Sequence, residues 1–118
     1  MDQQRDTKPA SLNRHEMIDG RLLAMHQLIA EKLKTEPLLL EKVKGNVLKE
    51  LRRCPDNTKP YFVRWQAILN ESLDATVEAL TSESEQATAL RQSSPFHGIL
   101  TPEERLDIIR KFRWGQRA

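Results

Sequence analysis

The stretch from Leu90 to Arg105, LRQSSPFHGILTPEER, constrains the fold of this chain most, because within it one helix must end and another must begin. Pro95 disfavours helical backbone angles at the residue before it, and Gly98 gives access to angles that are closed to other residues. The apolar residues around Gly98 need a core to cover them. We therefore expect a tight loop over residues 93–100 that is pinned to the interior of the protein.

A helix start signal follows this loop directly. Thr101 and Glu104 form a T-x-x-E capping pattern, in which the hydroxyl and the carboxylate each accept a hydrogen bond from a free backbone amide. Pro102 suits the first turn of a helix, where its missing amide hydrogen is not needed. These residues predict a final helix from Pro102 to about Trp114, with Leu106 on its inner face.

Apolar residues recur at helical spacings through the rest of the chain, and no run of four residues alternates as a strand would. The expected helices before the loop run from about 11 to 34, 37 to 53, 61 to 69, 72 to 80 and 82 to 92. The last of them has an S-x-x-E capping pattern at Ser82 and Glu85. The sequence predicts an all-α fold, a single compact domain of five to six short helices. We expect the first two helices to form an antiparallel hairpin, and Trp65, Phe96 and Leu106 to form the core.

Length and composition favour one domain. The 118 residues are 38% hydrophobic, which suffices for a single core. The polar residues 1–10 predict a disordered, flexible N-terminal tail, residues 11–114 the domain, and residues 115–118 a short C-terminal tail. The single cysteine, Cys54, excludes an internal disulfide, and no apolar run approaches the roughly 20 residues that span a bilayer. We therefore expect a cytoplasmic protein that does not contact a membrane.

The sequence gives no support for an enzyme or a metal site. It contains no nucleophile elbow, no phosphate-binding loop and no cysteine–histidine pair of defined spacing. His15 and Glu16 begin a zinc-like pattern, but Asp19 stands where the second histidine would be. We interpret His15 and His26 as ordinary histidines of a solvated helix. The expectation is a non-enzymatic protein that needs no metal and no cofactor.

Charge is nearly balanced overall but uneven along the chain. The 19 basic and 17 acidic residues give a net charge of +2, too little to indicate nucleic-acid binding by itself. Basic residues gather in the second helix and near the C-terminus. The candidate DNA contacts are Lys42, Lys44, Lys49, Arg52, Arg53, Arg110 and Arg113. A helix-turn-helix between Ala75 and Gln92 is disfavoured, because its second helix would bring carboxylates towards phosphates.

Two further groups of residues are candidates for contact with a protein partner. The segment 71–90 contains five acidic residues and no basic one, so it would attract a basic surface. The predicted loop would present polar side chains on a rigid frame, as binding loops often do. The candidates from both groups are Glu78, Glu83, Glu85, Ser93, Ser94 and His97. The His97 ring could also hydrogen-bond the loop backbone or present a proton at neutral pH, and of these two roles anchoring of the loop is the favoured one.

The motif LRQSSPFHGILTPEER resembles the ending of small bacterial proteins that read LRQSSPF-x-G-x-L-x-P-x-E-R and are often encoded beside toxin-like or nucleotidyltransferase genes. The likeness extends to SLNRHE at Ser11 and to the helix of Trp65, and it departs at His97, where a small residue is expected. It implies an antitoxin that neutralises its cognate toxin protein by direct binding. The alternative is a DNA-binding regulator that uses the second helix or the C-terminus on operator DNA. A homo-oligomer stays open.

Overall fold

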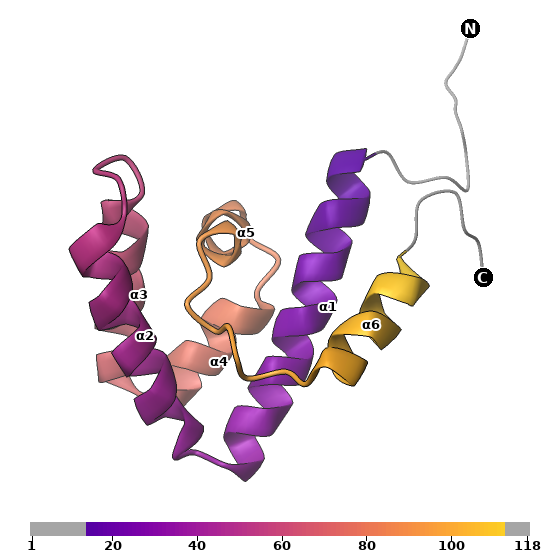
Figure 1. Cartoon of the computed structure of the whole chain (residues 1–118), viewed down its shortest axis with the longest axis horizontal. Helices are drawn as coiled ribbons and strands as arrows, with labels where there is room; N and C mark the ends of the chain where they lie inside the picture. The colour runs from indigo at the N-terminus through magenta and orange to yellow at the C-terminus, as the bar shows by residue number, and fades with distance from the viewer. Residues whose placement is uncertain (1–13, 113–118) are drawn as a thin grey trace, which may run out of the picture.

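The computed structural model describes residues 14–112, and in this range its regular secondary structure is all α-helix, without a strand (Figure 1). Its helices are α1 (Arg14–Thr35), α2 (Leu39–Arg53), α3 (Lys59–Glu71), α4 (Leu73–Thr81), α5 (Glu85–Gln92) and α6 (Pro102–Lys111). The all-α prediction is confirmed. No helix in the described range is long and apolar enough to cross a bilayer. The two predicted tails, Arg113 and the predicted helix end at Trp114 lie outside the described residues.

The helices pack in two groups, which α3 and α4 connect. α1 lies against α4, α5 and α6, whereas α2 lies against α3. The predicted hairpin of the first two helices is wrong, because α1 and α2 spread apart from the short turn that joins them, as Figure 1 shows. An amphipathic helix has one apolar face to bury. In α2 this face packs against α3 and not against α1.

Trp65 lies at the centre of the core and is fully buried. Its indole Nε1–H donates a hydrogen bond of 2.9 Å to the carbonyl oxygen of Leu90, so the polar end of the ring is satisfied. The ring of Phe96 meets it edge to face, with 5.1 Å between the ring centroids. The predicted burial of Trp65 and Phe96 is therefore confirmed, and the contact ties the loop after α5 to α3.

The predicted burial of the third core residue, Leu106, is wrong. Leu106 is 48% exposed, and Ile108 is buried in its place. The two residues are two positions apart, which puts them on nearly opposite sides of a helix. The helix lies against α1, where a Cβ at Gly20 would come within 3.0 Å of the Phe112 ring. The apolar pattern of this short helix fits two registers, and packing against α1 selects the one with Ile108 inside.

Serine and threonine side chains cap three of the helices. The T-x-x-E capping box of α6 is present, with Thr101 Oγ1 accepting from Glu104 N at 3.1 Å and Glu104 Oε1 accepting from Thr101 N at 2.8 Å. The capping box predicted at Ser82 is wrong. Ser84 caps α5, whereas Ser82 follows the last turn of α4 and donates its backbone N–H to Glu78. Both serines fit the sequence pattern of a helix cap. Ser84 is the one that caps α5, because α4 continues to residue 81 and Ser82 ends that helix.

A buried arginine joins α4 to α5. Arg91 is 3% exposed, and its guanidinium donates to the carbonyl oxygens of Ala79, Leu80 and Ser82, at 3.3, 3.4 and 2.6 Å. These carbonyls lie at the C-terminal end of α4, where no further turn of helix supplies an amide donor. The negative end of the helix dipole also favours a cation at this position. Arg91 therefore replaces the missing donors and fixes the angle between the two short helices.

Candidate functional site

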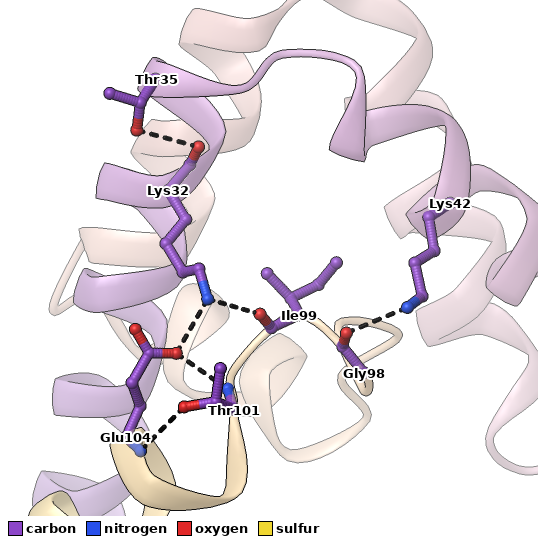
Figure 2. Close-up of polar contacts among 7 residues, drawn as sticks. All are labelled: Lys32, Thr35, Lys42, Gly98, Ile99, Thr101 and Glu104. Atoms are coloured by element: carbon purple, nitrogen blue, oxygen red, sulfur yellow. Dashed lines mark hydrogen bonds and ion pairs between the residues drawn. The ribbon is translucent and has the colours of Figure 1, made fainter.

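The loop over residues 93–100, which we call the anchored loop, crosses from α5 to α6 in front of the space between α1 and α2 (Figure 1). Side chains from both helices donate to its backbone carbonyls. Lys32 of α1 donates to Ile99 at 2.8 Å, and Lys42 of α2 donates to Gly98 at 3.0 Å (Figure 2). Asn46 donates to the carbonyl oxygens of residues 95 and 97, at 2.9 and 3.2 Å. The expectation that the loop is pinned is therefore met, with polar anchors added to the apolar ones.

The end of the loop is tied to the cap of α6 by one ion pair. Lys32 Nζ lies 2.8 Å from Glu104 Oε1, and the same carboxylate oxygen accepts the Thr101 amide (Figure 2). The hydrogen bond from Lys32 is the largest cause that lowers the pKa of Glu104 below its ordinary value. The capping box thus has a second function, because its glutamate also fixes α6 to α1.

His26 anchors the start of the loop from within α1. Its Nδ1 lies 2.6 Å from the carbonyl oxygen of Leu22, which can only accept, so Nδ1 carries the proton. Nε2 then accepts from the Ser94 hydroxyl at 2.7 Å, and that hydroxyl oxygen accepts the Phe96 amide at 3.2 Å. Burial lowers the pKa of His26 to about 4, against an opposing effect of the Leu22 hydrogen bond. The ring is therefore neutral at pH 7, as this network requires.

The interpretation of His26 as a solvated histidine is wrong, since the side chain is 3% exposed. A signal was present in the sequence: Leu22 lies four residues before His26 and Ile29 three residues after it, which places His26 on the apolar stripe of α1. Its partner Ser94 is 68 residues away. The spacing could have indicated burial, but no local pattern could have indicated the partner.

Gly98 provides the turn in the loop. Its φ is +82°, in the left-handed region where residues with a side chain are strained. A Cβ at this position would also lie 3.1 Å from Lys42 Nζ, the atom that holds the Gly98 carbonyl. Glycine is therefore needed both for the backbone angle and for the approach of the lysine, and the sequence-based expectation of a glycine turn is confirmed.

The three predicted loop residues have different surroundings. His97 is exposed, while Ser93 and Ser94 are half-buried. The Ser94 hydroxyl is already engaged by His26 and by the loop backbone. His97 lies near Glu50 of α2, whose pKa is lowered mainly by its hydrogen bond to Arg53 and to a lesser degree by His97. His97 is thus the member of the trio that the loop presents outward, and the anchors hold its backbone, not its ring.

The predicted acidic residues belong to a different surface. Glu78, Glu83 and Glu85 are all exposed, on α4, on the α4–α5 link and on the first turn of α5. Glu78 lines a groove of about 390 Å³ between α3, α4 and α5. No loop residue from 93 to 100 lines this groove. The acidic residues and His97 therefore do not form one site.

The basic candidates are mostly engaged within the chain. Lys42 holds the loop, and three others pair with a carboxylate three residues earlier on the same helix. These pairs are Lys44–Glu41 at 3.6 Å, Arg53–Glu50 at 2.8 Å and Arg110–Asp107 at 3.4 Å. Lys49 and Arg52 are exposed. The five candidates up to Arg53 are all on α2, Arg110 is on α6, and Arg113 lies outside the described residues.

Within the described residues, no group of three or more histidine, cysteine, aspartate or glutamate side chains is arranged to hold a metal ion. Comparison of the chain with protein-family models, with curated proteins and with solved structures gave no match.

Proposed function

We propose that this chain is a non-enzymatic protein-binding module, and that its concrete form is the antitoxin of a bacterial toxin–antitoxin pair. The observation that carries the proposal is the anchored loop, whose carbonyls at residues 95, 97, 98 and 99 are held by side chains from α1 and α2. A loop fixed before binding loses little conformational freedom when a partner docks on it. His97 is exposed on this frame.

The antitoxin form rests on the LRQSSPF-x-G-x-L-x-P-x-E-R resemblance, which covers the anchored loop and the cap of α6. The DNA-binding alternative has less support, because Lys42, Arg53 and Arg110 already have partners within the chain. Binding to DNA depends on neutralising phosphates with free cations. The favoured partner is therefore a protein, and the favoured contact surface is the loop.

The test is co-expression of the chain with the product of the neighbouring gene, followed by titration calorimetry of the purified pair. His97→Ala should leave the melting temperature unchanged, because the ring is exposed, and should weaken partner binding by about 1–2 kcal/mol. Lys49→Ala, an exposed change on α2, is the matched control.

Two outcomes would contradict this proposal. If the two proteins form no complex, the antitoxin form is lost. If His97→Ala binds as well as the unchanged chain while neutral replacements of Glu78, Glu83 and Glu85 weaken binding, the contact surface is the acidic one on α4 and α5.

A further inference from the structure

A second hollow lies on the inner side of the anchored loop, between α1 and α6. Its volume is about 360 Å³, at the lower end of the range for small-molecule sites. Most of the side chains that line it are apolar, and Met25, Ile29 and Phe96 belong to the buried core. The floor of this hollow is therefore suited to an apolar body of modest size.

The polar residues of the hollow are basic or neutral. Arg21 of α1 and Arg105 of α6 both line it, and none of the described residues that line it is acidic. Glu104, which precedes Arg105 in the sequence, pairs with Lys32. His26 and Ser94, which also line the hollow, are hydrogen-bonded to each other. The hollow is thus lined by two cationic side chains from two different helices and by no carboxylate.

Arg21 gives the second observation. Its Nε atom is buried and has no hydrogen-bond partner among the described residues. A buried donor without an acceptor is unfavourable, and buried polar groups in folded proteins are almost always satisfied. A guanidinium is the side chain best shaped to bind a carboxylate or a phosphate through two parallel hydrogen bonds. Since Arg21 lines the hollow, an anionic group bound there would place an acceptor beside its guanidinium.

We propose that the hollow between α1, α6 and the anchored loop is a binding site for a small amphipathic anion, a molecule that joins one carboxylate or phosphate monoester to an apolar body. Arg21 and Arg105 bind the anionic head group, and the apolar body packs against Met25, Ile29 and Phe96. His97, the proposed partner contact, also lines the hollow, but the residues assigned to the anion and to its apolar body are different ones and all belong to this chain.

The experiment uses three probes with one body: phenylbutyrate, phenylbutyl phosphate and the uncharged phenylbutanol, each titrated into the full chain by calorimetry. At least one of the two anions should bind, and the tighter of the two identifies the head group. Phenylbutanol and inorganic phosphate should each bind about tenfold more weakly, since one lacks the charge and the other the apolar body.

Arg21→Gln and Arg105→Gln should each weaken binding of the anion about tenfold, because each removes one charge-assisted contact. Arg52→Gln, an exposed arginine of α2 outside the hollow, is the matched control and should bind like the unchanged chain. Arg105 is exposed, so its variant keeps the test decisive if Arg21→Gln fails to fold.

Three results would overturn the proposal: no binding of either anion at millimolar concentration, binding of phenylbutanol or inorganic phosphate as tight as that of the anions, or undiminished binding by Arg105→Gln. The protein-partner titration is independent of this one. Loss of partner binding with intact anion binding would therefore refute only the proposed function, and the reverse result would refute only this site.

Discussion

At the scale of single residues, His26 couples the fold to pH. The neutral ring donates to Leu22 and accepts from Ser94, and both contacts depend on the Nδ1–H form. Burial, the largest effect, and the charge of Arg91 both lower the pKa of this ring to about 4, from 6.5 in the unfolded chain. Between these two values the unfolded chain binds more protons than the folded one. Stability is therefore fully present above pH 6.5 and falls as the pH drops towards 4.

We expect His26 to account for a loss of about 3 kcal/mol in the free energy of unfolding between pH 7 and pH 4, from a pKa difference of about 2.5. Urea denaturation at the two pH values measures the loss. His26→Gln has no titrating ring, so its loss over the same range should be smaller by this amount and should reflect the carboxylates alone. A His26 ring that titrates near pH 6.5 in the folded chain, by NMR, would contradict the expectation.

At the scale of helices, α3 and α6 contribute unequally to the core. Trp65 of α3 is fully buried and hydrogen-bonded to Leu90, whereas Leu106 of α6 is half exposed. Trp65→Ala should therefore cost about 3–5 kcal/mol, and Leu106→Ala should change stability by less than about 0.5 kcal/mol. Urea melts of the two variants measure the difference. A comparable loss for Leu106→Ala would mean that α6 packs in its other register.

The sequence predicted those parts of the fold that neighbouring residues determine. The Thr101–Glu104 capping box and the turn at Gly98 each depend on residues a few positions apart, and both were found as expected. The cap at Ser84 and the burial of Ile108 were missed because two local solutions fit equally and tertiary packing chose between them.

The anchors of the candidate site could not be predicted from local patterns. Asn46 and Lys32 contact loop residues that are 49 and 67 positions away, and each looks like an ordinary polar residue on a helix surface. The exposure of His97 on a fixed loop could be predicted, since it follows from the proline, the glycine and the apolar neighbours. The hollow that Arg21 lines could not be predicted, because only the fold brings α1 and α6 together.

At the scale of the whole molecule, the anchored loop takes the place of a direct contact between α1 and α2. The two helices spread apart (Figure 1), and they are joined through adjacent loop carbonyls, Ile99 to Lys32 and Gly98 to Lys42 (Figure 2). Asn46 adds the deepest of these bonds, to the carbonyl of Pro95. The loop is therefore a structural bridge as well as a candidate binding surface.

We expect Asn46→Ala to lower the free energy of unfolding by about 1–3 kcal/mol, because it leaves the carbonyls of residues 95 and 97 without their donor. Amide exchange over residues 96–100 should become faster in the same variant. Lys49→Ala on the same helix should change neither quantity. Unchanged exchange in Asn46→Ala would show that the apolar contacts of the loop suffice to hold it.

The anchors of the loop have one more consequence, which concerns how this surface can diversify. Lys32, Lys42 and Asn46 hold backbone oxygens, and every amino acid supplies such an oxygen. The side chain at position 97 can therefore be exchanged without cost to the bridge, whereas position 98 must stay glycine. Under the proposed function, a substitution at position 97 would therefore change the contact surface while the backbone anchors that hold the loop stay in place.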